Sequence, residues 1–226
     1  MSEMLIKPIA RIKNSFDSKF AIPRQSGILK EMKSEIIFEK DYRIAEALRE
    51  IGSFSHLWLI WGFSKNPKEK WSPTVRPPKL GGNKRVGVFA TRSPFRPNNL
   101  GLSSVKLLEV KKSKEKGMYL VVSGADLLNG TPIYDIKPYL PFTDIHPDAT
   151  GGFTEAIDIK KLIVVIPDKI KSTYDVEFIK NLEVILSENP RPSYHNDPNR
   201  VYGFSFAEKE IKFKVDGNIL TVVEID

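Results

Sequence analysis

Arginine, amide, carboxylate and glycine residues are concentrated in four segments of the chain, where packing of a core gives no evident reason for them. The segments span residues 20–27 (FAIPRQSG), 75–83 (VRPPKLGGN), 88–101 (VFATRSPFRPNNLG) and 126–141 (DLLNGTPIYDIKPYLP). Arginine presents a fork of donors that matches carboxylates and phosphates, and an amide both donates and accepts hydrogen bonds. Because prolines fix φ and stiffen loops, we expect rigid polar loops over a scaffold, where binding sites are commonly found.

Two arginine-bearing loops are candidates for anion binding. Arg24 and Gln25 follow Pro23 on an expected loop, and the alternative interpretation is a polar surface turn. Arg92 and Arg96 bracket a Ser-Pro-Phe tripeptide, and each guanidinium could pair with one carboxylate or phosphate. A structural salt bridge remains the alternative role for one of these two arginines.

A third candidate is the alternating run Asp135, Lys137 and Tyr139. In an extended segment, residues at i, i+2 and i+4 point the same way. A carboxylate, an amine and a phenol would then face one cavity, which predicts a catalytic face. The alternative is a polar ladder inside a β-barrel.

His56 opens an apolar octet that ends at Phe63, and this run predicts a strand buried on both faces. A histidine beside such a strand is more often a satisfied core group than a ligand-binding one. The Asn129–Gly130 dipeptide predicts a turn, because both residues tolerate positive φ. Its backbone groups could meet a ligand, although an ordinary turn between strands is the simpler interpretation.

Several classes of protein are disfavoured by what the sequence lacks. It has no cysteine, and its three histidines lie far apart, so a metal site would have to be assembled from distant loops. There is no phosphate-binding loop, no Gly-x-Gly-x-x-Gly between a strand and a helix, and no Gly-x-Ser-x-Gly elbow. We therefore expect no metal and no doubly wound cofactor domain.

The bulk properties favour a basic, cytoplasmic protein. The formal net charge of +7 and the pI of about 9.4 are compatible with binding a polyanion, although charge alone is a weak signal. The densest cluster, residues 111–116 (KKSKEK), is more simply a solvated hairpin tip. The first residues carry no apolar run, and the longest apolar stretches are strand-sized, so we expect no signal peptide and no membrane span.

The periodicity predicts a mostly antiparallel β protein with few helices. Expected strands cover residues 6–12, 34–39, 56–63, 86–90, 102–110, 118–123 and 162–166. Ile44, Leu48 and Ile51 share one helical face, which predicts a helix from Asp41 to Gly52. A second helix around residues 179–185 should end before Pro190, and residues 210–223 read as a hairpin turning at Asp-Gly. We expect two domains, residues 1–155 and 156–226.

Read as ordered blocks, the polar segments resemble the TrmO family, also known as the YaeB or TsaA-like family. The blocks here are IPRQ (22–25), SHLW (55–58), RPPKLGGN (76–83), FATRSPFRPN (89–98) and NGTPIYDIKPYLP (129–141), followed by NPRPSYH (189–195). The resemblance covers essentially the whole chain. It implies a single-sheet antiparallel β-barrel with a small C-terminal α+β domain, and a homodimer. It also implies an S-adenosylmethionine-dependent methyltransferase that converts N6-threonylcarbamoyladenosine at position 37 of threonine tRNA to its N6-methyl form.

The resemblance further implies roles for individual residues. The cofactor would contact Pro23, Arg24, Gln25, His56, Leu57, Arg92, Leu102, Asp126, Leu127, Leu128, Asn129, Gly130 and Thr131. Arg96 and Asn98 would lie near the substrate, and Arg191 and Tyr194 in the second domain would hold the anticodon arm of the tRNA or support a domain interface. Asp135 is the expected base, with Lys137 and Tyr139 beside it. The alternatives are a non-catalytic RNA-binding module on the same barrel, and a hydrolase or metal-dependent enzyme on a β-barrel.

Overall fold

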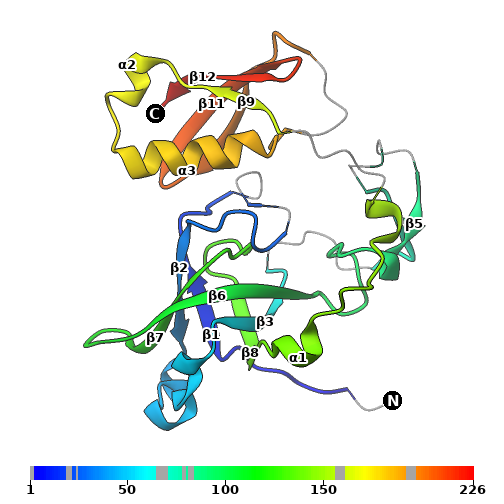
Figure 1. Cartoon of the computed structure of the whole chain (residues 1–226), viewed down its shortest axis with the longest axis vertical. Coiled ribbons are helices and arrows are strands. Elements are labelled where there is room, and N and C mark those ends of the chain that lie inside the picture. The colour runs from blue at the N-terminus through cyan, green and yellow to red at the C-terminus, as the bar shows by residue number, and fades with distance from the viewer. Residues whose placement is uncertain are drawn as a thin grey trace. The chain divides into compact units, whose positions relative to one another are not determined.

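The computed structural model shows a chain built mainly of strands, with little helix (Figure 1). It describes residues 3–18, 22–23, 25–64, 71–77, 80, 84–155, 161–191 and 197–226. The longest helix in these ranges has only 12 residues. The expectation of a mainly β protein with minor helix is confirmed.

The chain folds as two compact units that do not follow a single cut in the sequence. The first comprises Met1–Asn14, Arg24–Pro73 and Val88–His146, and the second comprises Ser15–Pro23, Thr74–Gly87 and Pro147–Asp226. The second unit thus includes two segments from the first half of the sequence. Each unit has its own sheet and its own buried side chains.

The first unit is a ring of six antiparallel strands. The strands are β1 (Ala10–Lys13), β2 (Lys33–Phe38), β3 (His56–Gly62), β6 (Leu100–Ser113), β7 (Gly117–Ser123) and β8 (Pro132–Pro138). They pair in the order β1-β2-β7-β6-β3-β8, and β1 also pairs with β8, so the ladder closes on itself. The short helix α1 (Pro141–Asp144) follows β8.

The core of this unit is filled by alternate side chains of the strands. On β3, Leu57, Leu59 and Trp61 are buried, whereas His56 and Trp58 are only half-buried. The prediction that this strand is buried on both faces is wrong, because the ring covers its inner face and leaves its outer face partly open. The apolar octet therefore contributes alternate side chains to the core and to the partly open outer surface.

Two segments expected to be regular are irregular. The helix predicted from Asp41 to Gly52 is instead three short 3₁₀ turns, Lys40–Tyr42, Ala45–Leu48 and Ile51–Ser53, with Glu50 at φ 65° between the last two. Of its three apolar positions, Leu48 is buried while Ile44 is 53% exposed, so no single helical face is covered. The strand expected at residues 86–90 ends at Gly87, because residues 88–90 turn into a 3₁₀ helix.

The second unit carries a four-stranded sheet with a helix across one face (Figure 1). Its strands are β9 (Ile163–Val165), β10 (Tyr202–Phe206), β11 (Lys209–Asp216) and β12 (Ile219–Ile225), ordered β10-β11-β12-β9 with β9 parallel to β12. The unit also holds the short helix α2 (Asp168–Lys171) and the two-stranded pair β4 (Thr74–Val75) and β5 (Val86–Gly87). Helix α3 (Val176–Ser187) is capped by Asp175 and buries Ile179 and Leu182. The predicted C-terminal helix and hairpin are confirmed.

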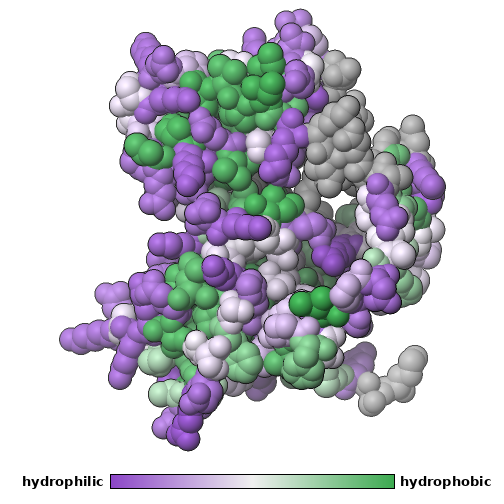
Figure 2. All heavy atoms as spheres, viewed as in Figure 1, coloured by the Kyte–Doolittle hydropathy of each residue, from purple (hydrophilic) through white to green (hydrophobic). Residues whose placement is uncertain are grey.

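The lysine-rich segment forms the tip of the β6–β7 hairpin. Lys112 pairs with Met118 and Ser113 with Gly117, so Lys114 and Glu115 lie at the exposed turn. Figure 2 shows hydrophilic side chains projecting from the end of this hairpin. The solvated-tip interpretation is confirmed.

Candidate functional site

One enclosed polar feature of the first unit is a chain of hydrogen bonds that ends on Asp126. The indole Nε1 of Trp61 donates to Ser103 Oγ at 2.9 Å, and Ser103 Oγ donates to Asp126 Oδ1 at 2.5 Å. Ser103 is 1% exposed and Trp61 is 7% exposed, so both hydrogen bonds are shielded from water. In such surroundings each hydrogen bond counts for more than it would in solvent.

Strand register explains why these residues meet. In the β3–β6 ladder, Leu59 lies opposite Ser103 and Trp61 opposite Gly101. Gly101 has no side chain, and the indole of Trp61 occupies that space: a Cβ at position 101 would lie 2.3 Å from Cε2 of Trp61. The indole can therefore bend over the neighbouring strand and reach Ser103. Asp126 reaches the same point from the loop that follows β7.

The same loop is held from the other side by the segment after Arg24. The backbone N–H of Gly27 donates to the carbonyl oxygen of Gly124 at 2.8 Å. Gly124 has φ 79° and Gly27 has φ 79°, a backbone region in which other residues are strained. The two glycines let the backbones approach closely, and the backbone of Ser26 in the same segment hydrogen-bonds to the carboxyl group of Asp126.

Gln25 and Arg92 complete the cluster. The Arg92 guanidinium donates to Gln25 Oε1, and the positive charge of Arg92 acts on the carboxyl group of Asp126. Three residues predicted to contact a cofactor, from segments more than thirty residues apart in sequence, thus meet in one place. We call Gln25, Arg92, Ser103 and Asp126 the Asp126 cluster.

Burial governs the electrostatics of this cluster. Desolvation raises the pKa of Asp126 above its ordinary value, and hydrogen bonds from Ser103 and from backbone groups, together with the charge of Arg92, partly oppose that rise. A carboxyl group with a perturbed pKa beside an arginine is a common feature of functional sites. The cluster brings together a hydrogen-bond acceptor, an amide and a cation.

The turn after Asp126 is less open than expected. Leu127, Leu128 and Thr131 are buried, and only Asn129 and Gly130 are exposed. Several of its backbone groups are already engaged. Asn14 Nδ2 donates to the Leu127 carbonyl at 2.9 Å, Gly130 N–H donates to Ile12 at 2.8 Å, and Thr131 N–H donates to Leu128 at 3.1 Å. Cofactor contacts from this turn stay a prediction.

His56 lies at the other end of β3, away from the Asp126 cluster. Its Nδ1 is 3.0 Å from Ser55 Oγ, and its ring centroid is 6.2 Å from that of Tyr139. His56 and Trp61 are five positions apart on the strand, which is about 17 Å at the usual rise per residue. Leu57 beside it is fully buried in the core. The structure of one chain therefore does not bring His56 and Asp126 together.

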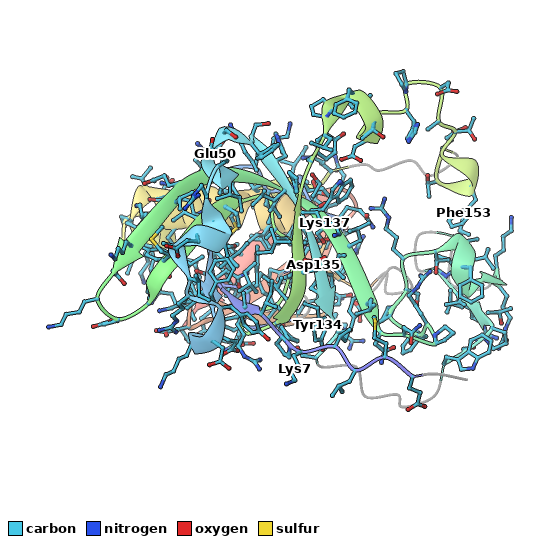
Figure 3. All side chains as sticks on the ribbon, turned by 90° about the horizontal axis from the view of Figure 1, so that it is seen from below. Lys7, Glu50, Tyr134, Asp135, Lys137 and Phe153 are labelled. Carbon is cyan, nitrogen blue, oxygen red and sulfur yellow. The ribbon has the colours of Figure 1, made fainter. Side chains whose placement is uncertain are left out.

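Asp135 and Lys137 share one face, as the alternation predicted, but that face is exposed. Lys137 Nζ lies 3.1 Å from Asp135 Oδ2, and the two side chains are 63% and 47% exposed. Both project from β8, where Figure 3 labels them. They pair with Trp58 and Ile60 of the outward face of β3. The alternative of a polar ladder inside the barrel is wrong for this pair, because both side chains are exposed, and the catalytic face stays a prediction.

Tyr139 extends this outer face beyond the end of β8. Its ring lies 5.5 Å from that of Trp58, whose indole Nε1 donates to Asp144 Oδ2 at 2.9 Å. Asp144 also accepts from the backbone N–H of Leu140 at 2.8 Å. Hydrogen bonds from Leu140 and then Trp58 lower the pKa of the Asp144 carboxyl group. The aromatic rings and α1 thus form one connected patch.

Arg96 hydrogen-bonds to backbone carbonyl groups of its own loop. Its Nη1 donates to the carbonyl oxygen of Thr91 at 2.6 Å, and its guanidinium lies 5.9 Å from the centroid of the Phe89 ring. Asn98 is exposed, and its carbonyl oxygen accepts from Leu100 N–H at 2.7 Å. Arg96 therefore braces the segment that presents Arg92.

The remaining predicted site residues are placed as follows. Leu102 is 55% exposed on the outer face of β6, Pro23 is buried, and Arg191 is half-buried in the second unit. Arg24, Tyr194 and His195 lie outside the described residues. Their roles stay predictions.

Ser103 and Trp61 were missed by reasoning on the sequence. A signal for Ser103 was present in the sequence. Residues 103, 105 and 107 alternate along the strand and point to the same side, and Val105 and Leu107 are buried. Ser103 is therefore a polar residue at a position where an apolar one is expected. Trp61 gave no such signal, because its apolar ring is ordinary for a core.

Neither a metal-ligand cluster nor a membrane-spanning helix is found among the described residues. In those ranges no three His, Cys, Asp or Glu side chains gather so that they could hold a metal ion. Among the helices in the same ranges, none combines the length and apolar character needed to cross a membrane.

This mainly β unit gathers a half-buried carboxyl group, an arginine and an amide, and its antiparallel ring differs from a doubly wound parallel sheet. Comparison with known proteins places it more closely. The tRNA-methyltransferase O N-terminal domain matches residues 11–145, and the TrmO C-terminal domain matches residues 162–226. The chain therefore belongs to the tRNA-methyltransferase O family, and it is a methyltransferase.

Individual relatives agree with this assignment. A tRNA (adenine(37)-N6)-methyltransferase from Escherichia coli strain K12 is 36% identical over 226 residues, covering 95% of this chain and 94% of the relative. One from Eikenella corrodens is 46% identical over 165 residues, covering 73% of this chain and 92% of the relative. A crystal structure of TrmO from Pseudomonas aeruginosa has a TM-score of 0.78 and 27% identity, and the match covers 100% of both chains.

Proposed function

We propose that the protein transfers a methyl group from S-adenosylmethionine to N6 of adenosine 37 in tRNA. The relatives from Escherichia coli and Eikenella corrodens are named for this reaction. Relatives from Pseudomonas aeruginosa and Pyrococcus abyssi are named as S-adenosylmethionine-dependent or S-adenosylmethionine-binding proteins. The observation in this chain that carries the proposal is the meeting of Gln25, Arg92 and Asp126.

The donor and acceptor groups of the Asp126 cluster fit this cofactor. S-adenosylmethionine has a carboxylate for a guanidinium, an adenine edge for an amide, and hydroxyl and ammonium donors for a carboxylate. Arg92, Gln25 and Asp126 supply the three complementary groups. When bound, the cofactor supplies a methyl group on a sulfonium, which is transferred by in-line displacement.

The chain's own task is to align the acceptor and take up its proton. We propose that the substrate is N6-threonylcarbamoyladenosine in threonine tRNA, because its urea-like N6–H is more acidic than that of adenosine, so a modest base suffices. Asp135 is the proposed base. Lys137, whose side chain is 63% exposed, would bind the threonyl carboxylate, with Tyr139 beside it. Lys137 suits this role better than Arg96, which is engaged with the Thr91 carbonyl.

The same proposal includes the tRNA partner, the oligomeric state and the cellular location. The net charge of +7 favours association with the tRNA backbone. The second unit, with Arg191 and Tyr194, would hold the anticodon arm, and the six-stranded ring would be the single β-barrel of the family. A homodimer would supply His56 of one protomer and the Asp126 cluster of the other to a common region. The proposed setting is the cytoplasm, where tRNA is modified.

The test is to titrate the purified protein with S-adenosylmethionine and S-adenosylhomocysteine by calorimetry. Methyl transfer is then measured on threonine tRNA with and without the threonylcarbamoyl group. We expect micromolar binding of both molecules and transfer only to the modified tRNA. Folded protein that binds tRNA but neither small molecule would overturn the proposal in favour of a non-catalytic RNA-binding module. Equal transfer to both tRNAs would reject the proposed substrate alone.

A further inference from the structure

We propose that Ser103 is a positioning residue for cofactor binding, which acts by holding the carboxyl group of Asp126 toward Arg92 and Gln25. The inference rests on the proposed function, since it assigns Asp126 to the cofactor. Ser103 itself is 1% exposed and is separated from any ligand by the groups around it. Its effect would therefore pass through Asp126.

The direction of the hydrogen-bond chain follows from chemistry. An indole N–H can only donate, so the oxygen of Ser103 must accept the bond from Trp61 at 2.9 Å. A hydroxyl has one hydrogen, and that hydrogen is then left for Asp126 Oδ1 at 2.5 Å. Trp61 thus fixes the hydroxyl rotor of Ser103, and Ser103 in turn fixes one oxygen of the carboxyl group.

Two strands and a loop are joined by this chain, so it also resists motion of the loop. Trp61 belongs to β3, Ser103 to β6, and Asp126 to the connection between β7 and β8. Trp61 has little freedom to turn away, because its ring packs 4.4 Å from the ring of Phe63 and fills the space left by Gly101. A site that is preorganised in this way loses less entropy when the ligand binds.

Ser103 also affects the charge on Asp126. Its hydrogen bond lowers the pKa of the carboxyl group, as does the positive charge of Arg92, while burial raises that pKa. Gln25 and Ser26, which lie on the facing segment, are uncharged. Without the Ser103 hydroxyl, the carboxyl group should therefore take up its proton at a higher pH, and a neutral carboxyl group is a weaker acceptor.

The experiment compares Ser103→Ala with Ser103→Thr and Ser34→Ala in the full chain. Thr keeps the hydroxyl, and Ser34 is another buried serine (3% exposed) in the same sheet. The ligand is S-adenosylhomocysteine, and its affinity is measured by calorimetry from acidic to neutral pH. For Ser103→Ala we expect binding about tenfold weaker, the usual effect of losing a hydrogen bond to a charged group. The fall in affinity on acidification should begin at a higher pH than in the wild type.

The controls separate positioning from general damage. Ser103→Thr should bind within a few-fold of the wild type, and Ser34→Ala should keep both the affinity and the pH profile. Unchanged affinity and pH profile in Ser103→Ala would overturn the proposal, as would equal weakening in Ser34→Ala. If the wild type binds no S-adenosylhomocysteine, the proposed function fails; the ¹³C carboxyl titration of Asp126 by NMR then still tests Ser103, and an identical pKa in wild type and Ser103→Ala would reject it.

Discussion

Gly101→Ala should destabilise the first unit, because a glycine there is required by one close contact. A Cβ at position 101 would lie 2.3 Å from Cε2 and 2.4 Å from Cζ2 of Trp61, a separation that non-bonded atoms do not tolerate. The indole would have to move, yet it is 7% exposed and packed against Phe63. Moving it would also lengthen the hydrogen bond from Trp61 to Ser103, now 2.9 Å.

The size of the effect can be estimated from these two losses. Overpacking a well-filled core costs about 1–3 kcal/mol, and a lost hydrogen bond costs about 1 kcal/mol. The free energy of unfolding should therefore fall by roughly 2–4 kcal/mol, out of the 5–15 kcal/mol typical of a domain. With an m-value of about 2 kcal/mol/M, the urea midpoint should fall by about 1–2 M.

Urea unfolding followed by tryptophan fluorescence is a suitable assay, since all three tryptophans belong to the first unit. The matched control is Gly52→Ala in the same unit, where the new Cβ would meet Val110 Cγ2 at an ordinary 3.6 Å. We expect that control to unfold near the wild-type midpoint. A wild-type midpoint for Gly101→Ala would show that the indole can move without loss, and the reasoning would be refuted.

Three further predictions concern carboxyl groups. Asp126→Asn should stabilise the ligand-free protein at neutral pH and weaken S-adenosylhomocysteine binding. Burial raises the pKa of Asp126 in the folded state. The stability that the protonated carboxyl group contributes is therefore present at low pH and is lost as the pH rises through the folded-state pKa. In thermal unfolding, the stability of Asp126→Asn relative to the wild type should increase with pH. Equal stability of the two proteins at neutral pH would contradict this prediction. Hydrogen bonds from Leu140 and Trp58 lower the pKa of Asp144, so wild-type stability should fall as pH drops below about 4, and Asp144→Asn should flatten that fall in acid titrations. Asp135→Asn should abolish methyl transfer yet keep cofactor affinity and unfolding temperature, because an exposed ion pair contributes at most about 1 kcal/mol; full activity would remove Asp135 from the chemistry.

The local sequence pattern was sufficient to predict a strand or helix where one face of that element packs against a single core. The strands at residues 102–110 and 118–123, which flank the lysine-rich turn, and the helix marked by Ile179 and Leu182 were correctly predicted, because each depends on near neighbours in sequence. The Asp-Gly turn before β12 was found for the same reason. The segment from Asp41 to Gly52 was misjudged, since its apolar spacing fits a helix while only part of that face has anything to pack against.

The sequence by itself determined the family, through ordered blocks of polar residues, and with it the residues worth examining. It could not decide which of them share a site. Gln25, Arg92 and Asp126 meet because β3 and β6 pair in one register and two glycines let distant loops touch. The exposure of Asp135, the partnership of Ser103 and Trp61, and the separation of His56 from Asp126 were likewise settled by tertiary structure. The physical reason is that burial and hydrogen bonding between strands depend on which residues face each other, and spacing along the chain does not specify that.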